Sequence, residues 1–408
     1  MGETATQIGV KHKMELAAYI FLLLSTFTVA FSLPVGRFFL AISLIFAVRS
    51  LWLKRKWPWI PASGWVGFVF VVWAVVVTLF LGMNPGLGAG MLTKLLWFAG
   101  IPAAALLVTT RNRLAGIMWA CAAGTTVLAA KMLVRNPIQA AMHVQAGDSG
   151  DFMSALVHVA SMADAQRLVI GLIATLGTAY VCRQEGRSAR WWQFMLVLQC
   201  IAFVMTFKRG SWLCACGIVI LFVLFKANWK YLAALVCVIL IAFSLPPVRS
   251  RLAGLKNEFH SDGGGRITMW FKVAPALIKQ HPYGVGYRCL TSEMMTEAAP
   301  EVEQGRNHLH SNIAEILVET GWLGLAVYLI WMALGFIDAS RFIFRARSGP
   351  ISEKTYALVL LLMLLGLFAN GLVEYNFADA ELVVPYGIII GAAAAGRHRT
   401  SSGSDLAE

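Results

Sequence analysis

The hydrophobic positions of the chain fall in long continuous runs, bounded by short stretches that contain Lys, Arg, Gly or Pro. A helix needs about 20 mostly apolar residues to cross a bilayer, whereas transmembrane β-strands show segments of about ten residues with alternating hydrophobicity. The pattern therefore predicts an all-α polytopic membrane protein. We expect about twelve transmembrane helices, at residues 15–33, 36–53, 64–82, 91–109, 114–133, 168–182, 191–207, 211–226, 229–245, 312–336, 356–372 and 382–396.

Composition agrees with this pattern. Hydrophobic residues make up 58% of the 408 positions and charged residues only 13%, whereas soluble domains are about 45–50% apolar and about 25% charged. The same figures exclude a disordered chain. The net charge of +13 would favour a nucleic-acid partner on a soluble protein, but cytoplasmic loops of membrane proteins are themselves rich in Lys and Arg.

The distribution of these charges predicts the orientation of the chain. Seven segments on one side of the predicted membrane contain more than half of the 34 Lys and Arg residues. The short loops on the other side contain only Arg37 and Lys94. The positive-inside rule then places both termini in the cytoplasm, and the net charge reports topology, so no nucleic-acid partner is expected.

We divide the chain accordingly. Residues 1–245 should hold the first nine membrane helices, with an outside loop at about 134–167. Residues 246–311 form a large outside loop, residues 312–396 the last three helices, and residues 397–408 a cytoplasmic tail. Long loops that fold are usually functional.

One segment of the large loop resembles an amphipathic helix. In residues 266–280 an apolar face is predicted to contain Ile267, Trp270, Phe271, Ala274 and Leu277. Such a helix can lie on the membrane surface. The alternative is a short helix packed on the rest of the protein, and the sequence leaves both open.

Two histidines close the large loop. His308 and His310 lie two residues apart, just before a predicted span. Histidine is a common general base and a common metal ligand. Asp148, Asp151 and Glu303 are available as further ligands, but no zinc-site spacing links them to the pair. A role as a base or hydrogen-bonding group is therefore favoured over a metal site.

Several cations lie at the outer edge of the predicted membrane. Lys208 and Arg209 separate two apolar spans, Arg167 begins another, and Arg266 follows a glycine run. Each could bind a phosphate, since a helix start also favours anions, or could extend to lipid headgroups. Ser211 is a candidate cap for the helix that starts near Arg209. Arg288, in the large loop, is a further candidate substrate-binding residue.

Two acids lie inside a predicted span. Glu315 and Glu319 are four residues apart and so share one helix face, and acids within membranes are often functional. The alternative is a structural ion pair with Arg209 or Arg266. Asn370, Glu374 and Asn376 are weaker candidates of the same kind.

These residues predict a pocket at the outer membrane surface that contains several cations and a histidine. A lipid-linked phosphate or pyrophosphate suits such a pocket. No P-loop is present, which argues against an ATP-driven pump, and no Asp-x-Asp pair is present, which argues against metal-dependent glycosyl transfer.

At this point the chain resembles a known family. His310-Ser311, nine residues, Gly321, two residues and Gly324 match the H-[NSQ]-x9-G-x-x-[GTY] signature of the O-antigen ligases. Arg209 and Leu213 match their R-x3-L element, and Arg266 lies in the loop where that family has a further essential arginine. The resemblance extends over most of the chain and includes the related O-antigen polymerases.

The resemblance implies a GT-C-like fold and a metal-independent, inverting transfer in the periplasm of a bacterial inner membrane, without a cofactor. The donor would be an O-antigen glycan on undecaprenyl pyrophosphate and the acceptor lipid A–core. His310, Arg209 and Arg266 are then the predicted catalytic residues. The predicted substrate-binding residues are Lys208, Arg167, His308, Arg288, Glu315 and Glu319.

Three alternatives remain at this level. His310 could be the general base or, as imidazolium, a phosphate ligand. An O-antigen polymerase would differ from a ligase only in its acceptor. A lipid-linked oligosaccharide flippase is the alternative from another class, but it would need cations deep within the spans rather than at their edge.

Overall fold

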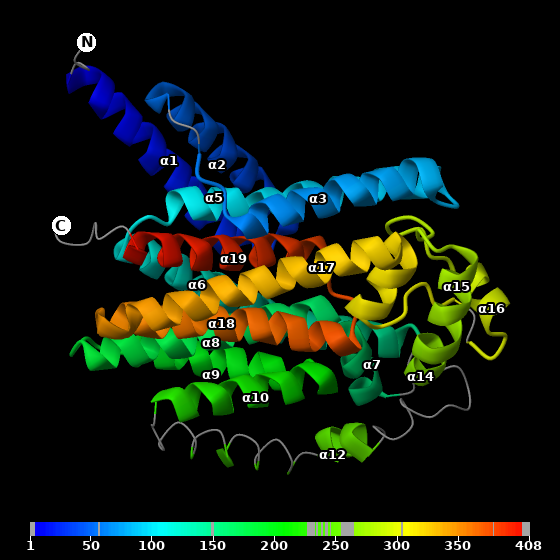
Figure 1. The fold of residues 1–408 in the computed structure, drawn as a ribbon. Helices are drawn as coiled ribbons and strands as arrows, with labels where there is room; N and C mark the ends of the chain where they lie inside the picture. The colour runs from blue at the N-terminus through cyan, green and yellow to red at the C-terminus, as the bar shows by residue number, and fades with distance from the viewer. Residues whose placement is uncertain are drawn as a thin grey trace.

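The computed structural model of the chain describes residues 5–55, 58–147, 151–226, 246–253, 265–302, 305–377 and 379–401, with scattered residues between 233 and 244. Every regular element in these residues is helical (Figure 1). The elements are α1 (Ala5–Val29), α2 (Leu33–Lys54), α3 (Ala62–Val76), η1 (Val77–Leu81), α4 (Pro85–Leu92), η2 (Thr93–Ala99), α5 (Gly100–Leu107), α6 (Arg111–Gln145), α7 (Phe152–Val159), α8 (Met162–Gln184), α9 (Arg190–Val204), α10 (Arg209–Lys226), α12 (Pro246–Ala253), α14 (Arg266–Thr268), η3 (Met269–Val273), α15 (Ala274–Gln280), α16 (Ser292–Ala298), α17 (Asn312–Arg345), η4 (Ala346–Ser348), α18 (Ile351–Val373) and α19 (Ala380–Ser401).

The predicted fold class is confirmed. Eight helical stretches in the described residues are long and apolar enough to cross a membrane. Among the other predicted spans, α9 has only 15 residues, α1 and α19 are outside this set, and 229–245 lies almost entirely outside the described residues. The chain is a polytopic α-helical membrane protein.

Large apolar side chains also face outward. Phe38, Ile45 and Trp52 on α2 are each more than 60% exposed, as are Leu213 and Leu224 on α10. Such a surface suits lipid contact, because a bilayer core has no water to penalise exposed apolar groups.

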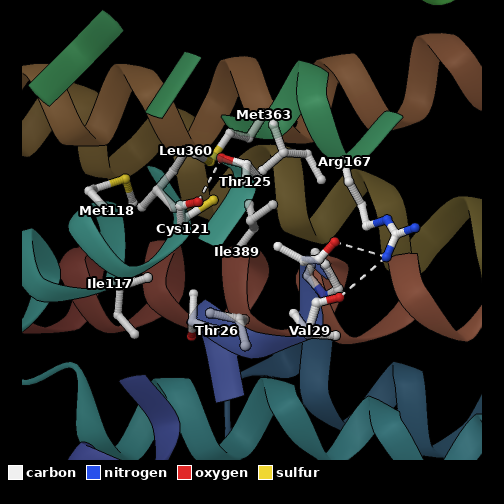
Figure 2. A pocket seen from close by; sticks show the side chains of 14 residues that line it. Thr26, Val29, Ile117, Met118, Cys121, Thr125, Arg167, Leu360, Met363 and Ile389 are labelled. Atoms are coloured by element: carbon white, nitrogen blue, oxygen red, sulfur yellow. Dashed lines mark hydrogen bonds between the residues drawn. The ribbon is translucent and has the colours of Figure 1, made fainter. Parts of the chain in front are cut away.

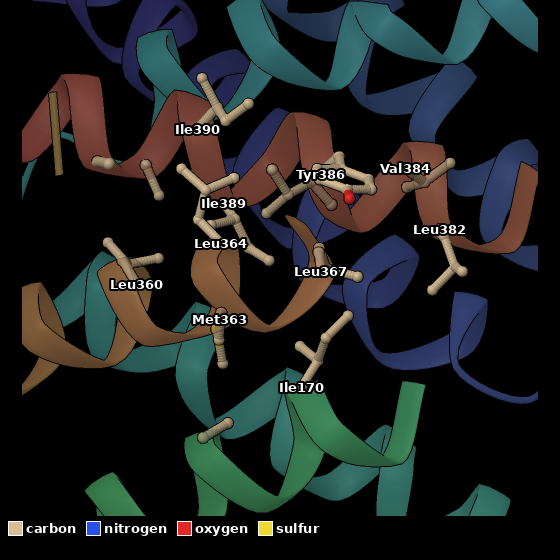
Figure 3. Packing of buried hydrophobic residues seen from close by; sticks show 14 of the residues in the cluster. Ile170, Leu360, Met363, Leu364, Leu367, Leu382, Val384, Tyr386, Ile389 and Ile390 are labelled. Carbon is tan, nitrogen blue, oxygen red and sulfur yellow. The ribbon is translucent and has the colours of Figure 1, made fainter. Parts of the chain in front are cut away.

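The core lies where α8, α18 and α19 meet. The apolar part of α8 is 94% buried, so this helix is surrounded by others and has no lipid-facing side. Figure 3 shows Ile170 of α8 beside Met363 and Leu367 of α18, with Ile389 of α19 beyond them. These helices form the framework that positions the loops at their ends.

Two predicted boundaries need correction. α6 continues to Gln145, twelve residues beyond the predicted end of its span, so the segment at 134–167 begins as helix and not as loop. The predicted span at 91–109 corresponds to α4, η2 and α5, which follow one another without a break and include a 3₁₀ stretch. Residues 134–145 contain polar side chains and Pro137, which suggested that the span had ended, whereas 91–109 is one apolar run that hides the change of helix type. The pattern alone therefore did not show where these elements end.

The segment 266–280 is helical as predicted, but its buried face differs. Met269, Val273 and Leu277 are buried, while Phe271, placed on the apolar face by the sequence, is 73% exposed. The cause is the π-helical turn η3, which adds a residue to the turn and rotates the later side chains. This turn precedes Pro275, which has no N–H to donate to a regular helix.

The same segment packs on protein. Its buried residues share a small apolar core with Val285, Cys289, Met295, Leu309 and Val318. The second alternative, a helix packed on the rest of the chain, is therefore the one that the structure supports. This small core attaches the large loop to the start of α17.

Candidate active site

The predicted catalytic residues come together at one end of the helices. In Figure 1, α7, α14, α15 and α16 lie at this end, and both termini lie toward the opposite end. Arg266 begins α14, Arg209 begins α10, and His310 lies just before α17. The end of α18 reaches the same place, because the carbonyl of Val373 accepts a hydrogen bond from Arg266, and a Cβ added to Gly210 would lie 3.4 Å from the Val373 side chain.

Glu374 connects the histidine to the arginine. Nδ1 of His310 lies 3.0 Å from one carboxylate oxygen of Glu374, and Nη2 of Arg266 lies 3.3 Å from the other. Burial raises the pKa of Glu374, but the hydrogen bond with His310 and the charges of His310 and Arg266 lower it more, so its net pKa is below the ordinary value. The carboxylate is therefore ionised.

This arrangement selects a histidine tautomer. An ionised carboxylate only accepts hydrogen bonds, so His310 donates to it from Nδ1–H. In the neutral ring, Nε2 then keeps its lone pair and can accept a proton. His310 also has a φ of +51°, a backbone conformation that is uncommon outside glycine and that clusters at functional sites.

His308 lies beside His310, with their ring centroids 4.0 Å apart. Burial, and then the neighbouring His310, lower the pKa of His308 to about 4, so its ring is neutral at pH 7. Its Nδ1 is buried and has no hydrogen-bond partner among the described residues. A buried unsatisfied nitrogen is costly, which makes this ring a candidate ligand-binding group.

The segment 308–310 is fixed from both sides. Nε1 of Trp270 donates to the carbonyl of Leu309 at 2.7 Å, and the N–H of Leu309 donates to a carboxylate oxygen of Glu315 at 2.5 Å. Glu315 is thus a positioning residue for the histidine loop. The ion-pair alternative for this acid does not hold with Arg266, since Arg266 pairs with Glu374.

Glu319 and Arg288 form a second group next to the first. The hydroxyl of Tyr375 donates to Glu319 at 2.6 Å, and the Arg288 guanidinium lies 5.9 Å from the centre of the Tyr375 ring. Tyr375 follows Glu374 directly. Arg288 and Glu319 therefore both lie beside Tyr375, the residue that follows Glu374 of the His310 cluster.

The signature glycine Gly321 interrupts α17. Its φ of 70° and ψ of −175° lie in a region that is essentially restricted to glycine. The break leaves carbonyls without helical partners, and a loop supplies the donors: the N–H of Val285 binds the carbonyl of Val318 at 2.9 Å, and that of Gly286 binds Glu319 at 3.0 Å. This loop carries Arg288, so Gly321 positions that arginine.

Replacing Gly321 should therefore destabilise the fold. A Cβ at this position would lie 2.6 Å from the carbonyl oxygen of Pro282, in addition to a backbone penalty of about 1–3 kcal/mol. We expect Gly321→Ala to lower the melting temperature of the purified protein. The matched control is Gly217→Ala on α10, where a Cβ meets nothing within 4 Å. Equal melting temperatures for the two variants would contradict this account of the break.

Asparagine side chains position the turn after α18. Oδ1 of Asn312 accepts from the N–H groups of Asn376 and Phe377 at 2.9 and 3.0 Å. Asn376 in turn donates to Gln166 at 2.6 Å, while Asn370 accepts from Ser211 at 2.9 Å. These bonds attach the segment containing Glu374 to α17, α8 and α10, which is a structural role for the two predicted asparagines.

Arg209 begins α10 as predicted, and Lys208 precedes it. Both side chains are partly buried at the end of the bundle that contains His310. Ser211 lies inside α10 and bonds to Asn370, so the predicted capping role is wrong. Its hydroxyl instead joins the first turn of α10 to α18.

Arg167 has a different environment. It pairs with Asp164 and donates to the carbonyl of Ala30 at 2.9 Å, beyond the last residue of α1. Figure 2 shows this contact beside a cavity of about 40 Å³ between α1, α6, α8, α18 and α19. That volume suits a water molecule or two and not a glycan. The contacts with Asp164 and Ala30 give Arg167 a structural role, which differs from both predicted alternatives, a bound phosphate and a lipid headgroup.

The fold and the cluster together define a polytopic membrane protein with a histidine–carboxylate–arginine site at one end of its helices. The family model described as O-antigen ligase matches residues 194–329, a third of the chain, which runs from α9 into α17 and includes Arg209, Arg266 and His310. The match confirms the predicted relationship: the chain contains a domain of the O-antigen ligase/polymerase superfamily. No curated protein matches the chain.

The main contribution that the sequence missed is that of Glu374. It lies outside the matched segment and 64 residues from His310. The only signal for it was an acid at the outer end of a predicted span, which placed it among the weaker candidates. Its contact with His310 could not be read from local spacing.

Proposed function

We propose that this protein is an O-antigen ligase. In this proposal it transfers an O-antigen glycan from undecaprenyl pyrophosphate to a sugar hydroxyl of lipid A–core, at the periplasmic face of a bacterial inner membrane. The domain match supports a transferase that acts on lipid-linked glycans in general. The observation that carries the narrower proposal is the His310–Glu374–Arg266 cluster at one end of an apolar helical bundle.

The cluster supplies the two functions that such a transfer needs. Nε2 of His310 takes the proton from the acceptor hydroxyl while Glu374 stabilises the imidazolium that forms. The hydroxyl oxygen then attacks the anomeric carbon from the side opposite the phosphate, which inverts the centre and breaks the bond to the pyrophosphate. General-base assistance of this kind contributes about 10²–10⁴-fold.

The departing pyrophosphate becomes more negative as that bond breaks. Arg266 and Arg209 neutralise this charge, because fixed guanidinium groups bind phosphate oxygens through two parallel hydrogen bonds. Arg266 is partly held by Val373 and Glu374, which fixes its plane before substrate arrives, and its other N–H groups are the donors available to phosphate. Arg288 and Lys208 extend the cationic surface.

The topology proposed from the charge distribution fits this site. The cluster lies at the end of the bundle opposite both termini (Figure 1). If both termini are cytoplasmic, as the positive-inside rule predicts, the cluster faces the periplasm, where lipid-linked glycans and lipid A–core meet. The apolar outer faces of the helices are then the surfaces along which the polyprenyl chain lies.

The decisive experiment identifies the product. Purified protein in lipid nanodiscs is incubated with lipid-linked glycan and lipid A–core, and the products are separated on a gel. A ligase gives glycan joined to lipid A–core. A longer glycan still attached to the polyprenyl carrier would instead identify an O-antigen polymerase, and movement of intact donor across the bilayer would identify a flippase.

Transfer should not require a metal ion. Because arginines take the place of a cation at the pyrophosphate, we expect the rate in excess EDTA to equal or exceed the rate in untreated buffer. The measurement is the initial rate of product formation with and without the chelator. Loss of activity in EDTA that a divalent ion restores would contradict this mechanism.

A further inference from the structure

Three potential metal ligands meet in the histidine cluster. One ligand atom each from His308, His310 and Glu374 lies within 4.8 Å of the others. The sequence gives His308 and His310 a spacing of two residues, but no recognised zinc-site spacing links this pair to a third ligand. The fold supplies the third from the turn after α18, 64 residues beyond His310.

The donor set resembles known metal sites. Two imidazoles and one carboxylate form the protein ligands of several zinc enzymes, in which a fourth position stays open. With bonds of 2.0–2.1 Å, ligand atoms in a tetrahedral zinc site lie about 3.3 Å apart. His310 and Glu374 are already 3.0 Å apart, so small side-chain rotations would bring all three groups to an ion.

His308 gives an independent indication. Its Nδ1 is buried and has no hydrogen-bond partner among the described residues, and the proposed transfer assigns no step to this ring. Coordination or a hydrogen bond to a bound group would remove the cost of an unsatisfied buried nitrogen.

We propose that His308, His310 and Glu374 bind a divalent transition-metal ion, for which Zn²⁺ is the best match, and that the bound ion inhibits transfer. The inhibitory part rests on the proposed function. The 3.0 Å contact with Glu374 uses Nδ1 of His310, so the ion replaces the proton on Nδ1 and the neutral ring carries its proton on Nε2. With Nε2 protonated and the carboxylate of Glu374 bound to the ion, the histidine can no longer accept a proton. A metal-independent enzyme would thus be inhibited by the metal.

Arg266 limits the affinity of this site. Its guanidinium lies 3.3 Å from Glu374, and a cation beside it is repelled. The ion therefore competes with Arg266 for the carboxylate, and binding should be reversible and moderate in strength, unlike that of a structural zinc with four protein ligands.

Metal binding can be measured without any transfer assay. Protein purified through a tag that contains no histidine is treated with chelator, placed in nanodiscs and titrated with Co²⁺, whose visible absorption reports tetrahedral coordination, and with Zn²⁺ by calorimetry. We expect one equivalent to bind. In His308→Ala the affinity should fall at least tenfold, and in Glu374→Gln similarly.

The matched control is His158→Ala, which removes an exposed histidine of α7 and should bind the metal like the wild type. Melting temperatures measured without metal check that each variant is folded, and His308→Gln replaces His308→Ala if the latter is unstable. Absence of binding, or equal affinity in wild type, His308→Ala and Glu374→Gln, would overturn the site.

Inhibition is tested separately. Zn²⁺ should lower the initial rate of transfer over the concentration range in which it binds, and EDTA should restore the rate. Zinc that binds but leaves the rate unchanged would overturn the inhibitory role. A protein that transfers no glycan under any condition would overturn the proposed function, while the Co²⁺ titration would still decide the metal site.

Discussion

His310→Ala should lower the rate of glycan transfer by about 10²- to 10⁴-fold, the range that a general base contributes. The alanine removes the only group that we assign to accept the proton of the acceptor hydroxyl. It also leaves Glu374 with Arg266 alone, so local charge remains paired and the fold should persist. The measurement is the initial rate with saturating donor and acceptor, together with the melting temperature of the variant.

The control for this variant is again His158→Ala, which should retain the wild-type rate. Glu374→Gln tests the positioning role of the carboxylate, because glutamine keeps the size of the side chain and loses its charge. If Glu374 acts through His310, the double variant should be no slower than His310→Ala alone. A wild-type rate in correctly inserted His310→Ala would show that His310 is not the base.

Arg266→Lys should lower the transfer rate by about 10²- to 10³-fold, which is the typical effect of removing one transition-state hydrogen-bond donor. The Arg266 guanidinium bonds to Val373 and Glu374 at once and still has N–H groups for phosphate. Lysine keeps the charge but has a single ammonium group, so it cannot maintain these contacts and a bidentate phosphate contact together. The loss should appear mainly in kcat, because the charge grows in the transition state.

Arg187→Lys is the matched control for this substitution. Arg187 is exposed and pairs with Glu185, next to the end of α8, and its replacement should leave the rate unchanged. Arg209→Lys should also lose activity, because lysine lacks the planar fork that binds phosphate through two hydrogen bonds. Full activity in both Arg209→Lys and Arg266→Lys would rule out bidentate neutralisation of the pyrophosphate.

The local pattern of apolar residues was enough to predict the helices of the bundle, because a membrane-spanning helix requires about 20 mostly apolar residues in a row. It was less reliable at their ends. α6 continues past Leu133, the predicted end of its span, through polar residues, and the π turn before Pro275 changed which side chains of 266–280 are buried. In both cases backbone hydrogen bonding or packing outweighed the local apolar pattern.

The sequence predicted the surroundings of some candidate site residues well and those of one of them poorly. His310, Arg209 and Arg266 were found from motifs and membrane position, and the fold brings them to one end of the bundle. Arg167 matched the same criteria but bonds to Asp164 and the end of α1. Charge at a membrane edge predicts that a group is near the interface and not which partner it meets.

The sequence by itself determined that this is an α-helical membrane protein and that loops rich in Lys and Arg alternate with loops that contain few of them. It also predicted that His310, Arg209 and Arg266 lie on the same side. These properties follow from composition and short spacing. Only the tertiary structure decided that Glu374 bonds to His310 and Arg266, that Gly321 breaks α17 to admit the Arg288 loop, and that His308 lies beside His310 and Glu374. Such contacts depend on how distant helices pack together, and a linear pattern carries no direct record of them.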